Sequence, residues 1–122
     1  MRKVVLGFLF LFLISFVMAV PETNVSYFYS SGCSHCAEVL SSGVLDEVAQ
    51  IEGVNFEKLE TTSSQEARDK FLGYVEGFGI ERAGVPFFVV ERDGKYSYLM
   101  GDSPIIDHGV DSVENFRGVD FG

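Results

Sequence analysis

The strongest constraint on the fold of this chain is the position of its only two cysteines, Cys33 and Cys36, which enclose Ser34 and His35. Residues 25–30 are mostly aromatic or β-branched, which is typical of a buried β-strand. In residues 36–51 the apolar side chains recur at helical spacing. The cysteine pair therefore lies where a strand gives way to a helix, which brings both sulfur atoms to the N-terminal end of that helix.

The next part of the chain predicts a second strand and a second helix. Residues 54–59 alternate apolar and polar side chains, as a strand does. Residues 63–66 have the sequence of a capping box, which opens a helix that Gly77 and Gly79 end. In the first helix, Ser31 or Ser34 is a candidate N-cap and Gly43 a candidate kink.

The C-terminal third predicts a hairpin. The unbroken apolar run of residues 87–90 is typical of a central strand. An Asp-Gly turn at residues 93–94 returns the chain as an antiparallel strand over residues 96–100. Residues 103–106 are a loop or the start of a helix, and Asp111 or Ser112 is a candidate cap for a short last helix through Phe116.

The predicted order is thus β-α-β-α-β-β, with a possible last helix. Strands separated by helices are expected to pair in parallel through right-handed crossovers, and the hairpin adds an antiparallel pair. The predicted fold class is therefore α/β, with helices packed on a mixed sheet.

The N-terminus predicts export. Arg2 and Lys3 precede residues 4–20, which carry no charge, and Val17 and Ala19 suit the −3 and −1 positions of a cleavage site. This is the pattern of a secretory signal peptide, although the run also approaches the length that spans a bilayer. A buried core helix is disfavoured because the run has no polar face. Residues 1–19 are thus a signal peptide or a membrane anchor, and residues 22–122 form the domain.

Export places the cysteines outside the cytoplasm, where disulfides persist. The predicted location is extracytoplasmic: secreted, periplasmic or anchored and facing outward.

The whole chain has a net charge of −9, and without residues 1–19 it keeps 7 basic and 18 acidic residues, a net charge of −11. This charge argues against nucleic acid or an anionic membrane surface as the main partner. Contact with a membrane is expected only through an N-terminal anchor.

Two separated motifs give the chain a family resemblance. Residues 28–36 (FYSSGCSHC) and residues 84–90 (GVPFFVV) resemble the cysteine motif and the cis-proline loop of thioredoxin-fold thiol–disulfide oxidoreductases. The resemblance covers roughly residues 24–102. It implies a central sheet of about four strands with helices on both faces, and a cis Pro86 beside the cysteine pair.

The chemistry of such a pair follows from its place on the helix. The N-terminus of a helix carries unpaired N–H groups and about half a positive charge, which favours the thiolate form of Cys33. Cys36 lies one turn further in, so it is expected to be shielded and to act as the resolving thiol. The expected activity is enzymatic disulfide exchange with protein substrates, with no metal and no cofactor beyond the Cys33–Cys36 disulfide.

The neighbours of the pair imply a direction for this exchange. His35 adds a possible cation beside the thiolate, and stabilising the reduced form makes the disulfide a stronger oxidant. Periplasmic DsbA-like oxidases can carry His in this slot and Val before the cis-proline, as Val85 does here. The resemblance therefore implies an oxidase or isomerase rather than a strong reductase. Ser34, His35, Val85 and Pro86 are the residues expected to modulate the site or bind substrate.

The chain also departs from the family pattern. Thioredoxins have an acidic residue six positions before the first cysteine, where this chain has Tyr27, so proton transfer needs another group; Glu57 is a candidate. Phe87 follows the proline where thioredoxin has Thr, and it is expected to enlarge an apolar patch beside the site. The chain is too short for the inserted helical domain of DsbA-like enzymes.

The expected partners are protein thiols and disulfides and an unidentified redox recycling partner, and the protein is expected to be a monomer. Three other interpretations remain open. The cysteines could form a merely structural disulfide, although a bridge over two residues closes almost no loop. They could bind a metal with His35 and His108. The domain could also be a non-catalytic binding module, or a metal or apoprotein carrier, on the same fold.

Overall fold

The computed structural model describes residues 22–121, so the predicted signal peptide or anchor lies outside the described residues. These residues form one four-stranded sheet, and four helices cover its two faces. The elements are β1 (Thr23–Tyr29), α2 (Ser34–Ser42), α3 (Val44–Ala49), β2 (Val54–Glu60), α4 (Gln65–Phe78), β3 (Phe87–Arg92), β4 (Lys95–Met100) and α5 (Asp102–Glu114). Within residues 22–121, no helix is both long and apolar enough to cross a membrane.

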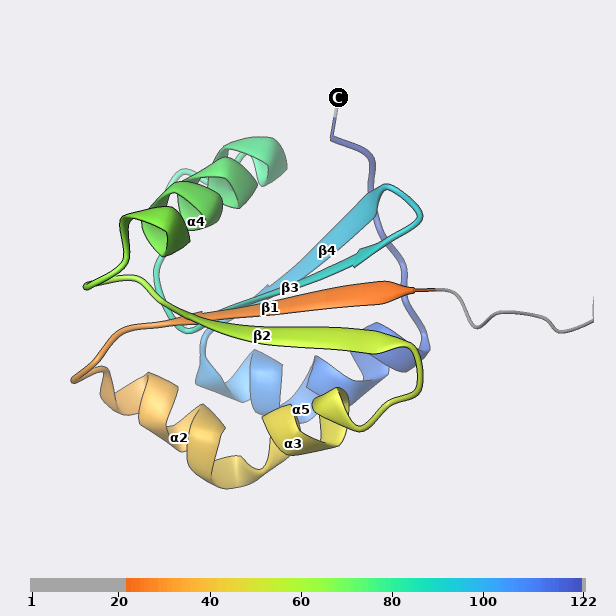
Figure 1. The fold of residues 1–122 in the computed structure, drawn as a ribbon, viewed down its shortest axis with the longest axis horizontal. Helices are drawn as coiled ribbons and strands as arrows, with labels where there is room; N and C mark the ends of the chain where they lie inside the picture. The colour runs from red at the N-terminus through yellow and green to blue at the C-terminus, as the bar shows by residue number, and fades with distance from the viewer. Residues whose placement is uncertain (1–21, 122) are drawn as a thin grey trace, which may run out of the picture.

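The helices lie on both faces of the sheet, as Figure 1 shows: α4 covers one face, and α2, α3 and α5 cover the other. Each face has its own core. Val25, Tyr27 and Phe88 are buried in the core under α2, α3 and α5, whereas Phe28 and Phe87 are buried in the core on the side of α4. The alternation of side chains along β1 and β3 separates the two cores. The prediction of an α/β fold with a four-stranded mixed sheet is confirmed.

The strands are ordered β2-β1-β3-β4. β1 pairs with β2 in parallel, and β3 pairs with β4 in the predicted antiparallel hairpin. The expectation that helix-separated strands pair in parallel is wrong for β3, which runs antiparallel to β1 with Phe28 opposite Phe87. The reason is the segment 79–86, which follows α4 and returns the chain to the carboxyl end of β1 before β3 begins.

The starts of α4 and α5 agree only in part with the predicted ones. The N-cap of α4 is Ser64, whose hydroxyl accepts a hydrogen bond from the backbone N–H of Ala67, so the helix starts one residue later than the capping-box sequence indicates. The last helix starts at Asp102, which agrees with the alternative that residues 103–106 begin a helix, whereas the candidate caps Asp111 and Ser112 lie inside it. Pro104 lies in the first turn of α5, where its missing N–H has no helical partner to lose.

Gly43 interrupts the first helix, as predicted. It adopts φ +85° between α2 and α3, a left-handed conformation that costs any other residue except asparagine or aspartate about 1–2 kcal/mol. The bend lets α3 place Val44, Leu45 and Val48 in the core.

This backbone geometry gives a matched pair of substitutions. Gly43→Ala is expected to lower the free energy of unfolding by about 1 kcal/mol, because alanine is strained at positive φ while no atom lies within 4 Å of the new methyl group. Gly73 lies in α4, also with open space around it, so Gly73→Ala is expected to raise the free energy of unfolding by up to about 1 kcal/mol. Urea unfolding of both variants measures the difference, and equal effects would contradict the backbone explanation.

Candidate active site

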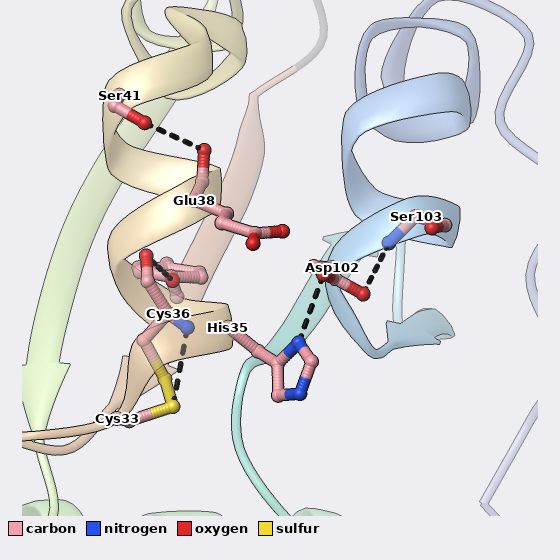
Figure 2. Close-up of polar contacts among 8 residues, drawn as sticks. Cys33, His35, Cys36, Glu38, Ser41, Asp102 and Ser103 are labelled. Carbon is pink, nitrogen blue, oxygen red and sulfur yellow. Dashed lines mark hydrogen bonds and ion pairs between the residues drawn. A yellow bond between two sulfur atoms is a disulfide. The ribbon is translucent and has the colours of Figure 1, made fainter.

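Cys33 and Cys36 form a disulfide at the start of α2, with their Cα atoms 5.2 Å apart. Cys33 is half-buried, whereas Cys36 is only 1% exposed. Figure 2 shows Cys33 just before the helix and Cys36 on its first turn. Cys36 is thus shielded and Cys33 is the more exposed of the pair, as the sequence predicts, whereas their roles in disulfide exchange stay a prediction.

Cys33 is itself the N-cap of α2. Its backbone is extended (φ −82°, ψ 110°), and its Sγ accepts a hydrogen bond from the backbone N–H of Cys36 at 3.1 Å. Neither Ser31 nor Ser34 caps the helix, so that expectation is wrong; Ser34 is the exposed first residue of α2. The hydrogen bond and the helix dipole both favour negative charge on the Cys33 sulfur once the disulfide is reduced.

The proline loop is connected to the cysteine motif through the start of α5. The Val85–Pro86 peptide bond is cis, and the carbonyl of Pro86 accepts a hydrogen bond from the backbone N–H of Gly101 at 2.9 Å. The next residue, Asp102, contacts His35 of the cysteine motif. Pro86 is buried and Val85 is half-buried. Segments that are far apart in the sequence are therefore brought together around the disulfide.

His35 reaches across from α2 to α5. Its Nδ1 lies 2.9 Å from Oδ2 of Asp102, and the side chains are 68% and 24% exposed respectively. The hydrogen bond and the charge of Asp102 raise the pKa of His35 above its ordinary value of 6.5. The hydrogen bond with His35 is the largest cause that lowers the pKa of Asp102 to about 2. His35, which lies between the two cysteines in the sequence, is thus held by Asp102 in a setting that favours the imidazolium.

Glu38, one turn after His35, completes this group. Its carboxylate points toward Asp102 in Figure 2, and the hydrogen bond with Asp102 is the largest cause that raises its pKa. One ligand atom from each of His35, Glu38 and Asp102 lies within 4.8 Å of the others. In the part of the chain that the structure describes, this is the only such group of three or more possible metal ligands. It includes neither cysteine, and His108 lies exposed further along α5, so the alternative site of two cysteines and two histidines is not assembled.

Tyr27 occupies the position where thioredoxins have an acidic residue. Its side chain is fully buried, and its hydroxyl donates a hydrogen bond to the carbonyl of Cys36 at 3.2 Å. Burial raises the pKa of Tyr27 to about 12, so it stays neutral and cannot act as a base near neutral pH. Glu57 does not replace the missing acid, because it pairs with Lys70 on the face of the sheet covered by α4, and that suggestion is wrong.

Phe87 does not enlarge an exposed patch, contrary to the expectation from the sequence. It is fully buried and packs against the rings of Phe28 and Phe71 in the core on the side of α4. Val85, which is half-buried, packs against the same core.

Glu60 supports the loop before Cys33 from the end of β2. Its carboxylate accepts hydrogen bonds from the backbone N–H groups of Ser31, Thr62 and Ser63 at 3.3, 2.8 and 2.9 Å. Hydrogen bonds from the Ser63 and Thr62 hydroxyls contribute most to lowering its pKa to about 2. Glu60 thereby ties the cysteine loop to the turn that precedes α4.

The Glu60 carboxylate leads to a prediction for the stability of the protein at acid pH. The pKa of Glu60 lies below its ordinary value of 4.5, so its stabilisation is complete above pH 4.5 and is lost as the pH falls toward 2. Glu60→Gln is expected to lower the free energy of unfolding at pH 7 and to flatten its decline between pH 4.5 and 2, as measured by urea unfolding. Glu81→Gln, at an exposed loop position, is the matched control. Acid profiles of the same steepness in the Glu60 variant and the native chain would contradict this role.

Asp102 and Glu60 were not predicted from the sequence. Asp102 is 67 positions from His35, and Glu60 is 29 positions from Ser31. No local pattern connects residues at such separations, and only the pairing of the strands brings them together.

No protein-family model and no curated protein matches the chain. Solved structures do match it. The thioredoxin of Aeropyrum pernix is 18% identical, with a TM-score of 0.59 over 80% of this chain and 77% of that one. Thioredoxin f2 of Chlamydomonas reinhardtii is 15% identical, with a TM-score of 0.57 over 80% of this chain and 81% of that one.

The thioredoxin of Fasciola hepatica is 22% identical, with a TM-score of 0.54 over 75% of this chain and 80% of that one. At these identities the likeness concerns the fold. The chain is therefore a thioredoxin-fold protein that carries a Cys-x-x-Cys disulfide at the start of α2.

Proposed function

We propose that the protein is an exported thiol–disulfide oxidoreductase that acts on protein substrates. The observation that carries this proposal is the Cys33–Cys36 disulfide, in which the half-buried Cys33 caps α2 and the buried Cys36 lies behind it. A purely structural role fits poorly, because a bridge over two residues constrains the unfolded chain very little.

The exchange proceeds in two displacements. A substrate thiolate attacks Sγ of Cys33, the Cys33–Cys36 bond breaks, and Cys36 leaves as a thiolate that takes a proton from solvent. A second substrate thiolate then attacks the substrate sulfur of the mixed disulfide, which releases Cys33 as a thiolate and completes the substrate disulfide. Two electrons pass from the substrate to the protein, and a recycling partner removes them.

The surroundings of Cys33 favour the oxidising direction. The N-terminus of α2 and the charged form of His35 both stabilise a Cys33 thiolate, which stabilises the reduced protein and raises the reduction potential of the disulfide. A tenfold stabilisation corresponds to about 30 mV for this two-electron couple. We therefore assign the protein to the oxidases or isomerases rather than to strong reductases.

The location rests on the sequence alone, through the signal or anchor pattern of residues 1–19. In an oxidising compartment the Cys33–Cys36 disulfide persists and can be transferred to a substrate. The residues that carry the chemistry are Cys33 and Cys36, and His35, Ser34, Val85 and Pro86 surround them. The proposal also includes protein thiols and disulfides as substrates, an unidentified redox recycling partner and a monomeric state.

Trapping of mixed disulfides tests the function. In Cys36→Ser, the Cys33 thiolate can still attack a substrate disulfide, the reverse of the second displacement, and release one substrate thiolate; no second cysteine then resolves the mixed disulfide, so mixed disulfides with protein substrates are expected to accumulate. Cys33→Ser is the control and is expected to trap none. If Cys36→Ser also traps none, and the native reduced chain instead binds a stoichiometric metal ion, the protein is a metal carrier and the proposal fails.

A further inference from the structure

His35 belongs to the cysteine motif, but the group that holds it comes from the other side of the site. The His35 Nδ1–Asp102 Oδ2 contact of 2.9 Å joins the first turn of α2 to the first residue of α5. Figure 2 shows the imidazole ring extending from α2 to this carboxylate. An exposed histidine with no such contact would sample several rotamers.

Asp102 is itself held in place by the backbone. Its Oδ1 accepts a hydrogen bond from the N–H of Ser103 at 2.8 Å, and the preceding Gly101 donates its N–H to the carbonyl of Pro86 at 2.9 Å. The carboxylate is therefore attached to the proline loop on one side and to α5 on the other. A side chain fixed in this way can fix its partner.

The contact also determines where the proton of His35 lies. A carboxylate accepts hydrogen bonds only, so Nδ1 must carry the proton that the bond uses. Loss of a proton from the imidazolium must then occur at Nε2, and it leaves Asp102 bound to a neutral ring. The carboxylate gains most from the charged ring, so it favours the imidazolium.

We propose that Asp102 is a positioning residue which, by holding His35 charged and oriented beside Cys33, makes the Cys33–Cys36 disulfide easier to reduce. This inference rests on the proposed function and extends it by assigning a residue on α5 to control of the redox equilibrium. In that equilibrium two glutathione molecules reduce the disulfide to two cysteines and become one glutathione disulfide, so electrons and sulfur atoms balance.

The charges at the site have opposing effects on a Cys33 thiolate. Glu38 of α2 and Asp102 of α5 are the charged groups that face His35. Each carboxylate repels a Cys33 thiolate directly, whereas Asp102 also attracts it indirectly through His35. A single substitution of Asp102 mixes the two effects, and a double-mutant cycle separates them because the direct repulsion is the same with and without His35.

The test is a cycle of His35→Gln and Asp102→Asn in the otherwise native chain, with the equilibrium constant for reduction by glutathione measured at pH 7.5. In the presence of Asp102, His35→Gln is expected to lower this constant about three- to fivefold, the size of an exposed charge pair. Asp102→Asn removes the largest causes that raise the pKa of His35, so the ring carries less charge at this pH and the same substitution is expected to change the constant less than about twofold.

Three controls accompany the cycle. Asp102→Glu keeps the carboxylate and is expected to restore much of the effect of His35. Asp107→Asn removes the same charge from an exposed position of α5 and is expected to leave that effect unchanged. Thermal unfolding of the Asp102→Asn variant shows that the fold is intact, since asparagine can still accept the hydrogen bond from the Ser103 N–H.

A second measurement follows the ring directly. An NMR titration of His35 in the oxidised chain is expected to give a lower pKa in Asp102→Asn than in the native chain. Equal effects of His35→Gln in both backgrounds, or no effect in either, would overturn the inference. The glutathione equilibrium needs no protein substrate, so an intact cycle together with a failure of Cys36→Ser to trap substrates would reject the proposed function alone.

Discussion

Cys33→Ser is expected to lower the rate of disulfide exchange with a protein substrate by at least about a thousandfold. A serine hydroxyl is not ionised near neutral pH and cannot enter thiol–disulfide exchange. The remaining Cys36 thiol is buried, with 1% of its surface exposed, and therefore does not substitute for the missing nucleophile. The rate of disulfide formation in a reduced, unfolded protein substrate, followed in a glutathione buffer, measures this loss.

The matched control for this variant is Ser34→Ala. Ser34 is exposed between the two cysteines and does not cap the helix, so its hydroxyl is not required to position either sulfur. Its exchange rate is expected to stay within a few-fold of the native rate. Substantial turnover by Cys33→Ser would mean that Cys36 is the attacking group, and the assignment of the two cysteines would have to be reversed.

The largest loss of stability is expected for Phe28→Ala. Phe28 is fully buried in β1, and its ring lies 5.6 Å from Phe71, 5.9 Å from Tyr74 and 6.1 Å from Phe87, centroid to centroid. Removing a buried phenylalanine costs about 3–5 kcal/mol, because apolar contacts are lost and the neighbours only partly fill the cavity. Small domains unfold at a total cost of about 5–15 kcal/mol, so the variant is expected to be marginally stable.

Leu72→Ala is the control for this prediction, because Leu72 lies on the same helix as Phe71 but is 58% exposed. The free energy of unfolding is expected to change by less than about 0.5 kcal/mol. Both values come from urea unfolding under identical conditions. A Phe28→Ala loss as small as that of Leu72→Ala would contradict the buried aromatic contact between β1 and α4.

The parts of the fold that could be predicted are those with local signals. The aromatic strand before Cys33, the interruption at Gly43 and the Asp-Gly hairpin each depend on the side chains of a few consecutive residues. The same holds for the two motifs, since a cysteine pair after a strand and a proline before another are visible in the sequence. These signals were sufficient for the order of the strands and helices along the chain and for the hairpin, but not for the direction of β3.

The parts that could not be predicted depend on long-range geometry. The antiparallel direction of β3 depends on the path of the segment 79–86, which has no periodic pattern. The sequence left residues 103–106 open between a loop and the start of α5, because Pro104 is usually a sign of a loop but is tolerated in a first turn. The Asp102–His35 contact follows from both of these features, so it was missed together with them.

Because the Cys36 N–H donates a hydrogen bond to the Cys33 sulfur, the exchange rate of this amide proton depends on the chemical state of the sulfur. A thiolate accepts a hydrogen bond more strongly than a disulfide sulfur does, and a mixed disulfide turns the sulfur toward its new partner. The exchange of this single amide proton with deuterated water should therefore slow upon reduction and quicken while a substrate is attached. One backbone position would then report each stage of a turnover without any added probe.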